Sequence, residues 1–256
     1  MSVKNSKRKT LCIVLCALCI SLSSPLHAFT DEDIASYQRA VSDRSPGERI
    51  ALWAERFVGT PYDPDPQGAY VTREVIVADD TIDCMYHTFR SVELAMSHSP
   101  DEALAVAIDK RFHGRGIVSE GRVLNYEARF RYGEDMLESG KWGREVTAEI
   151  GPETSIEGSR GRERIVMVAR ETLLSSLAEG NSKLKSGDIV FFIKTPGKRV
   201  AGEIVGHIGI IKHEGGTIYL IHANGRKGSG GMVKKVLFSD YLKGMPFEGV
   251  RVSRFD

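Results

Sequence analysis

The stretch GHIGIIKHEGGTIYLIHAN, from Gly206 to Asn224, is typical of a β-hairpin because two apolar runs flank the polar turn HEGG. A two-residue loop at Glu214–Gly215 would place His207 directly opposite His222. A loop at Gly215–Gly216 would leave the two histidines diagonal but on the same face, whereas a three-residue loop would put them on opposite faces. We therefore expect two imidazoles side by side on one surface of the sheet.

Further β-rich runs surround this hairpin in the last third of the chain, whereas helical patterns dominate the first half. Helices are predicted over residues 31–59, 84–97 and 99–112, with a short strand within 73–84. Helices followed by a meandering antiparallel sheet predict an α+β fold, in which N-terminal helices pack on a C-terminal antiparallel sheet. The other predicted strands are RERIVMVAR (162–170), GDIVFFIK (187–194), GGMVKKVLF (230–238) and GVRVSRF (249–255).

Cys84 is the one cysteine beyond residue 19, and it opens the helical pattern of TIDCMYHTFRSVELAMS (81–97). A lone thiol is either buried for structural reasons or used chemically. At the start of a helix, the dipole and the free N–H groups would stabilise its thiolate. His207 would then act as a base, and His222 would hold His207 in the required orientation and tautomer.

The first 28 residues have the pattern of a signal peptide, with a basic start, the apolar run Leu11–Leu22 and cleavage after Ala28. The apolar run has 12 residues, which is too short to span a bilayer. The mature chain, residues 29–256, is expected to be a single domain and a monomer. We expect it to be periplasmic or secreted, without a stable membrane anchor.

The charge balance argues against nucleic acid as the main partner. Removing the signal peptide takes away four basic and no acidic residues, which changes the net charge from +1 to −3. Within the mature chain, residues 114–161 are rich in Gly, Arg and Glu and match no clear pattern. This segment is interpreted either as an insertion that shapes a substrate site or as ordered surface loops.

Several motifs together resemble the NlpC-like, papain-fold peptidoglycan hydrolases. An Asp-Cys pair opens a helix, and the runs GDIVFF (187–192), GHIGII (206–211) and IHAN (221–224) follow it in the order typical of that family. The segment GTPY (59–62) resembles the one that precedes the family's cysteine. The ending DYLKGMPFEGVRVSRF (240–255) resembles that of the N-acetylmuramoyl-L-alanine amidase-like subgroup.

The resemblance implies a cysteine-dependent amidohydrolase without metal or organic cofactor, acting on peptidoglycan or muropeptides. Cys84 would be the nucleophile, His207 the base and His222 the orienting residue, while Tyr62 would bind substrate or stabilise the oxyanion. The implied bond joins muramic acid to L-alanine; the alternative is the γ-D-glutamyl bond to the diamino acid. The pattern departs at Glu93, which follows the cysteine about one helical turn late, and this leaves His87 and Arg90 without an assigned role.

Two other classes of function stay open at this stage. The residue types of Cys84, His207 and His222 would also suit a zinc ion with water as its fourth ligand. However, the expected mature chain, residues 29–256, has no closely spaced ligand pair such as C-x-x-C. A murein-binding module that keeps the fold without turnover is the second alternative.

Overall fold

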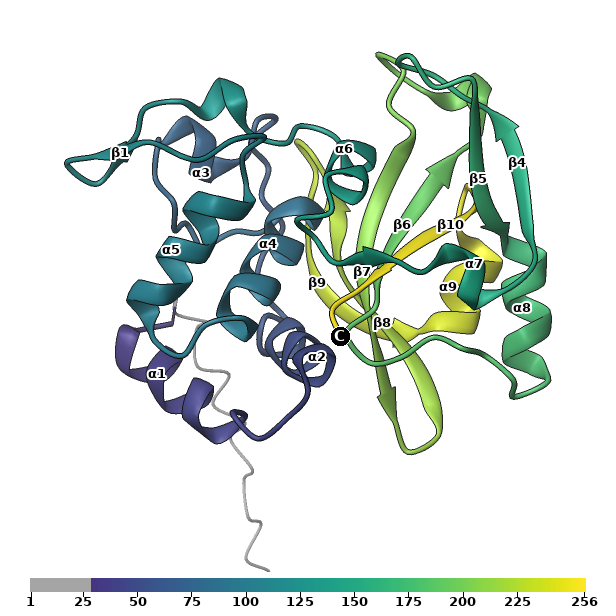
Figure 1. Cartoon of the computed structure of the whole chain (residues 1–256), viewed down its shortest axis with the longest axis horizontal. Helices are drawn as coiled ribbons and strands as arrows, with labels where there is room; N and C mark the ends of the chain where they lie inside the picture. The colour runs from purple at the N-terminus through teal and green to yellow at the C-terminus, as the bar shows by residue number, and fades with distance from the viewer. Residues whose placement is uncertain (1–28) are drawn as a thin grey trace, which may run out of the picture.

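The computed structural model describes residues 29–256, so the predicted signal peptide lies outside the described residues. The described chain is an α+β protein, with helices first and an antiparallel sheet after them (Figure 1). Between residues 29 and 256, no helix has the length and apolar character needed to cross a membrane. The helices of the first half are α1 (Asp31–Ala40), α2 (Pro46–Arg56), α3 (Ala69–Thr72), α4 (Cys84–Ala95) and α5 (Pro100–Lys110).

Side-chain caps set the starts of these helices. Thr30 and Ser45 each form a capping box with the acidic residue three positions later, and Pro46 occupies the first turn of α2. Ser99, where the predicted third helix starts, caps α5 by accepting a hydrogen bond from the Glu102 N–H. Asp83 caps α4 by accepting a hydrogen bond from the Tyr86 N–H, so the helix begins at Cys84.

The main sheet has the strand order β4-β5-β10-β6-β7-β8-β9, with β3 paired to β10. All six predicted C-terminal strands are confirmed, and strands β6 to β9 form the expected meander. The last strand departs from it, because β10 lies between β5 and β6. The strands are β3 (Arg144–Glu145), β4 (Glu153–Glu157), β5 (Arg164–Ala169), β6 (Ile189–Lys194), β7 (Val205–Glu214), β8 (Thr217–Arg226), β9 (Gly230–Leu237) and β10 (Phe247–Arg254).

Helices cover both faces of this sheet (Figure 1). The N-terminal helices lie on one face, and α8 (Arg170–Ala178) and α9 (Phe238–Gly244) lie on the other. Strand β6 shows the division, since Phe191 packs into the first core and its neighbour Phe192 into the second. Because both faces are covered, β6 reads as a continuous apolar run instead of an alternating one.

Residues 114–161 contain short elements that contribute to the first core. Phe130, Met136 and Trp142 are all buried there. The segment holds β1 (Val118–Ser119), β2 (Arg122–Val123), η1 (Tyr126–Ala128), α6 (Gly133–Glu138), β3, α7 (Thr147–Ile150) and β4. Its apolar residues are too far apart in sequence to show a period, which is why the pattern gave no assignment.

The predicted strand within residues 73–84 does not form; only Ile82 makes an isolated bridge, to Tyr62. The backbone polar groups of this stretch bond to other partners. The Ile76 carbonyl accepts a hydrogen bond from Arg111, and the Ala78 N–H donates to the Tyr86 hydroxyl. With these groups already paired, no strand is needed to satisfy the buried backbone.

A buried network of four charges supports α4 and accounts for Arg90 and Glu93. Glu93 receives hydrogen bonds from Arg111 at 2.6 and 2.7 Å, and Arg90 bonds to Asp79 at 2.8 and 2.9 Å. Arg90 also reaches Glu93 at 3.3 Å, which joins the two pairs. The late glutamate of the sequence pattern therefore anchors the helix in the core and does not face the cleft.

Candidate active site

The β7–β8 hairpin has the second of the two registers that keep the histidines on one face. Ile210 pairs with Ile221, and Glu214 pairs with Thr217, so the loop is Gly215–Gly216. Both loop glycines have positive φ, at 56° and 80°, as a type I′ turn requires. The directly opposed register is therefore wrong, whereas the diagonal, same-face arrangement is confirmed.

The two imidazoles contact each other directly. His207 Nε2 lies 2.7 Å from His222 Nδ1, and the ring planes are almost perpendicular. The His207 ring also stacks on Phe192 and Phe247, while Tyr241 packs edge-on against His222. This apolar enclosure lowers the pKa of His207 to about 4 and that of His222 to about 2, so both rings are neutral at pH 7.

Helix α4 brings Cys84 to the same place. The helix packs against β7 and β8, and its first residue meets the N-terminal half of β7. Cys84 and His207 line one cavity of about 270 Å³, and Cys84 as a residue is half-buried. The other lining residues are Met85, Arg131, Tyr132, Gly133, Val200, Glu203, Val205, Gly206 and Ile208.

The predicted stabilisation of a thiolate at Cys84 is wrong for this arrangement. Burial, followed by the negative charge of Asp83, raises the pKa of the thiol to about 12. A backbone hydrogen bond from Ile208 and the charge of Lys227 act in the opposite direction but are outweighed. The helix dipole alone would favour the thiolate, but the Asp83 carboxylate that caps the same helix opposes it. In the resting site the sulfur therefore carries its proton.

Tyr62 lies beside this site but does not line the cavity with Cys84. Its ring packs on Gly225, where an added Cβ would lie 2.2 Å from the ring, and its N–H bonds to the Gly231 carbonyl. Burial raises the pKa of the Tyr62 hydroxyl. Gly225 and Gly231 pair with each other where β8 and β9 adjoin the β8–β9 turn, so this end of the hairpin positions the tyrosine.

Lys227, from the same β8–β9 turn, lies between Tyr62 and the start of α4. Its Nζ lies 3.1 Å from Asp83 Oδ2, so the turn reaches the residue that caps α4. Tyr241 and Arg131 also belong to the surroundings of the site and were not found from the sequence. The tyrosine is within the quoted ending of the chain, but no local pattern indicates that its ring reaches His222.

His87 is a buried core residue. Its Nε2 lies 3.2 Å from the Ala54 carbonyl, and its ring packs edge-on against Phe57. Its Nδ1 has no hydrogen-bond partner among the described residues. Burial lowers the pKa of His87 to about 4, so it is neutral at pH 7.

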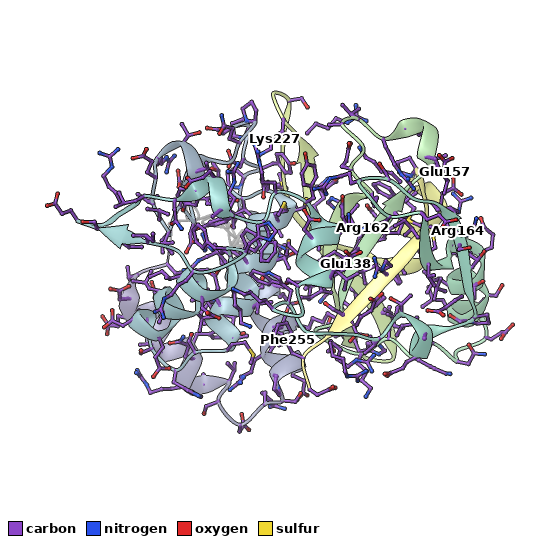
Figure 2. The ribbon with its side chains drawn as sticks, turned by 45° about the horizontal axis from the view of Figure 1, so that its top comes forward. Glu138, Glu157, Arg162, Arg164, Lys227 and Phe255 are labelled. Atoms are coloured by element: carbon purple, nitrogen blue, oxygen red, sulfur yellow. The ribbon has the colours of Figure 1, made fainter. Side chains whose placement is uncertain are left out.

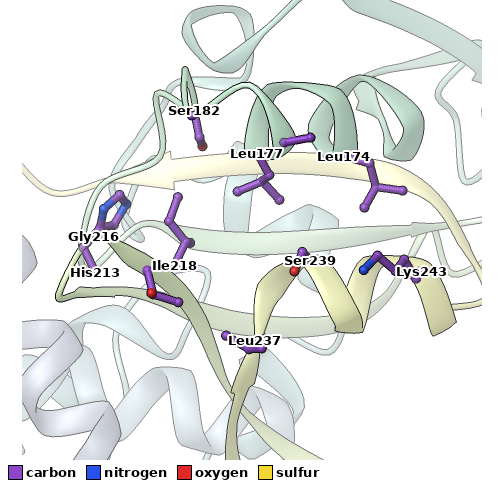
Figure 3. A pocket seen from close by; sticks show the side chains of 12 residues that line it. Leu174, Leu177, Ser182, His213, Gly216, Ile218, Leu237, Ser239 and Lys243 are labelled. Carbon is purple, nitrogen blue, oxygen red and sulfur yellow. The ribbon is translucent and has the colours of Figure 1, made fainter.

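A larger cavity lies elsewhere, between α8, α9 and the turn of the β7–β8 hairpin (Figure 3). Its volume is about 560 Å³, and Leu174, Leu177 and Ile218 supply much of its wall. None of the predicted site residues lines it. Across residues 29–256, no group of three His, Cys, Asp or Glu side chains is placed to hold a metal ion.

Comparison by sequence finds no matching family model and no matching curated protein. Solved structures do match in fold. An N-acetylmuramoyl-L-alanine amidase from Bacteroides uniformis is 18% identical, with a TM-score of 0.61 over 82% of this chain and 98% of its own. A DUF1460 protein from Legionella pneumophila is 14% identical, with a TM-score of 0.61 over 87% of this chain and 93% of its own.

A third neighbour carries a different name. A candidate xylanase from Bacteroides fragilis is 19% identical, with a TM-score of 0.60 over 80% of this chain and 100% of its own. At these identities the likeness concerns the fold, and one fold supports several functions. The function must therefore be argued from the site.

Proposed function

We propose that this chain is a cysteine-dependent amidohydrolase of peptidoglycan, with the NlpC-like variant of the papain fold as a single domain over residues 29–256. One observation carries the proposal. Cys84, at the start of a helix, lines a cavity together with His207, whose Nε2 lies 2.7 Å from His222 Nδ1. Nucleophile, base and orienting group then come from α4, β7 and β8, three elements that pack together.

The histidine pair supports a defined proton path. For His207 to accept a proton at Nδ1, its own hydrogen must be on Nε2, from which it donates to His222 Nδ1. His222 thus selects the useful tautomer of His207. Since the Cys84 thiol and His207 are both neutral at rest, the proton moves from sulfur to imidazole as the sulfur attacks the amide carbon.

The remaining steps of acyl transfer use the same residues. Asp83 occupies the N–H groups of Tyr86 and His87 through its side chain and carbonyl. The Cys84 and Met85 N–H groups have no partner within the helix and are available to the oxyanion, with Tyr62 nearby. The low pKa of His207 favours return of its proton to the leaving amine, after which water hydrolyses the thioester.

We assign the scissile bond to the linkage between muramic acid and L-alanine. The two supports are the motif order in the sequence and the name of the Bacteroides uniformis neighbours with this fold. A cleavable signal peptide over residues 1–28 would deliver the enzyme to the periplasm or the exterior, where this substrate occurs. Residues 114–161 would be the insertion that shapes the substrate site.

Defined muropeptides test this proposal. Mature protein is incubated with a muramoyl tripeptide that contains both amide bonds, and the products are identified by mass spectrometry. Release of the intact peptide with a free L-alanine amine is expected, whereas release of the diamino acid alone would reassign the bond. Cys84→Ser should keep the fold and lose turnover, because the serine is similar in size and much less nucleophilic. Turnover by Cys84→Ser equal to wild type would refute cysteine catalysis.

A further inference from the structure

One wall of the catalytic cavity comes from the segment that has no recognisable sequence pattern. Arg131, Tyr132 and Gly133, which lead into the first turn of α6, line the same cavity as Cys84 and His207. This wall is therefore specific to residues 114–161 and is separate from the helix and strands that carry the proposed catalytic groups.

The backbone of this wall is held firmly against β7. Glu134 is completely buried, and its carboxylate accepts hydrogen bonds from the Ile204 and Val205 N–H groups at 3.2 and 3.1 Å. Gly133 touches the same strand so closely that an added Cβ would lie 2.6 Å from Val205 Cγ1. The wall thus has a definite position relative to His207, two residues further along β7.

Ion pairs hold the outer side of α6. Arg160 bonds to Glu134 at 2.8 Å and stacks 3.6 Å from the centre of the Tyr132 ring. Arg162 bonds to Asp135 and Glu138, as Figure 2 shows for the second pair. Neighbouring arginines of this region are therefore engaged within the protein.

Arg131 differs from them because its side chain is exposed and forms no hydrogen bond or ion pair with any residue from 29 to 256. The other charged side chain lining the cavity, Glu203, is paired with Lys194. On the opposite side of the site, Lys227 is paired with Asp83. Among the described residues, the Arg131 guanidinium is therefore the charged group of this cavity that has no ion-pair partner, and it lines the same cavity as the proposed nucleophile Cys84.

We propose that Arg131 determines specificity by binding the free α-carboxylate of the second residue of the peptide stem. The inference rests on the proposed function. In a muramoyl peptide, the sugar and the scissile amide are neutral, and D-glutamate linked through its γ-carboxyl leaves its α-carboxylate free. That group is the negative charge closest to the scissile bond. A guanidinium binds a carboxylate through two parallel hydrogen bonds, so an amidated stem would lose this contact.

Two substrates that differ at one group test the inference. N-acetylmuramoyl-L-alanyl-D-glutamate and its D-isoglutamine analogue share the same scissile bond, but only the first carries the α-carboxylate. Wild type should favour the acid by about 10-fold or more in kcat/KM, as expected for a charge-assisted hydrogen bond in a partly exposed site. The preference should weaken as salt concentration rises.

Arg131→Gln should abolish this preference by slowing hydrolysis of the acid, with little change for the amide. Arg131→Lys should retain part of it, because the charge remains and the paired donors are lost. The matched control is Arg115→Gln, which removes an exposed arginine outside the cavity and should leave the preference intact. Binding of both compounds to Cys84→Ala and Cys84→Ala/Arg131→Gln proteins measures the same contact without turnover.

The outcomes separate the two proposals. Hydrolysis of both compounds at equal rates, or an equal effect of Arg131→Gln on both, would overturn the carboxylate contact and leave the amidase intact. If wild type cleaves neither compound but the Cys84→Ala proteins show the arginine-dependent preference in binding, the contact stands and the enzymatic function fails. No cleavage and no difference in binding would overturn both.

Discussion

The hydrogen bond between His207 and His222 makes a quantitative prediction about His222, the orienting residue of the proposed catalytic set. His222→Phe keeps an aromatic ring but removes the acceptor that lies 2.7 Å from His207 Nε2. The His207 N–H would then be buried without a partner, which costs about 1–3 kcal/mol. If that cost falls on the transition state, kcat/KM drops about 5- to 150-fold. His222→Gln supplies an amide oxygen as a replacement acceptor and should stay within about 10-fold of wild type.

The assay is steady-state hydrolysis of a defined muropeptide, with the fold of each variant checked by circular dichroism and thermal unfolding. His207→Ala is the reference for loss of the proposed base, which should lower the rate of hydrolysis about 10²–10⁴-fold. His213→Phe is the matched control. It places the same substitution on an exposed histidine of β7, six positions from His207, and should leave the rate unchanged.

Two results would refute this reasoning. A folded His222→Phe protein with the wild-type rate would show that His207 needs no acceptor at Nε2. Equal losses in His222→Gln and His207→Ala would show that His222 does more than orient its neighbour.

Three further predictions follow from burial. A thiol with a pKa of about 12 is ionised to only about 1 part in 10⁴ at pH 8. Iodoacetamide, which reacts with the thiolate, should therefore label Cys84 far more slowly in the folded protein than in the unfolded protein. Rapid labelling of Cys84 at pH 7 in the folded protein would contradict this. The free energy of unfolding should fall as the pH is lowered from 6.5 to about 4, because the histidines bind protons in the unfolded chain and stay neutral in the folded one. Each ring contributes up to about 1.4 kcal/mol per pH unit. Urea unfolding that is independent of pH in this window would refute the prediction. The rings concerned are those of His87, His207 and His222. Arg111→Met should cost about 3–5 kcal/mol in urea unfolding by leaving the buried Glu93 short of its main partner, whereas exposed Arg115→Met should cost little and serves as the control.

The spacing of apolar residues in the sequence was sufficient to predict the helices and strands that have a regular apolar pattern. The caps at Ser99 and the helix start at Cys84 were predictable because they depend on residues within one turn. The same-face position of His207 and His222 was predictable because side chains alternate strictly along a hairpin. Which two residues form the loop was not, since Glu214–Gly215 and Gly215–Gly216 both suit a tight turn.

Tertiary structure decided everything that depends on contacts between distant segments. Strand β10 lies between β5 and β6, which are distant from it in sequence. Arg131 lies at the cavity in a segment that the hydrogen bonds of Glu134 hold against the start of β7. The pKa of Cys84 was predicted in the wrong direction for the same reason. A helix dipole can be inferred from local sequence, but burial and the balance of surrounding charges exist only once the chain has folded.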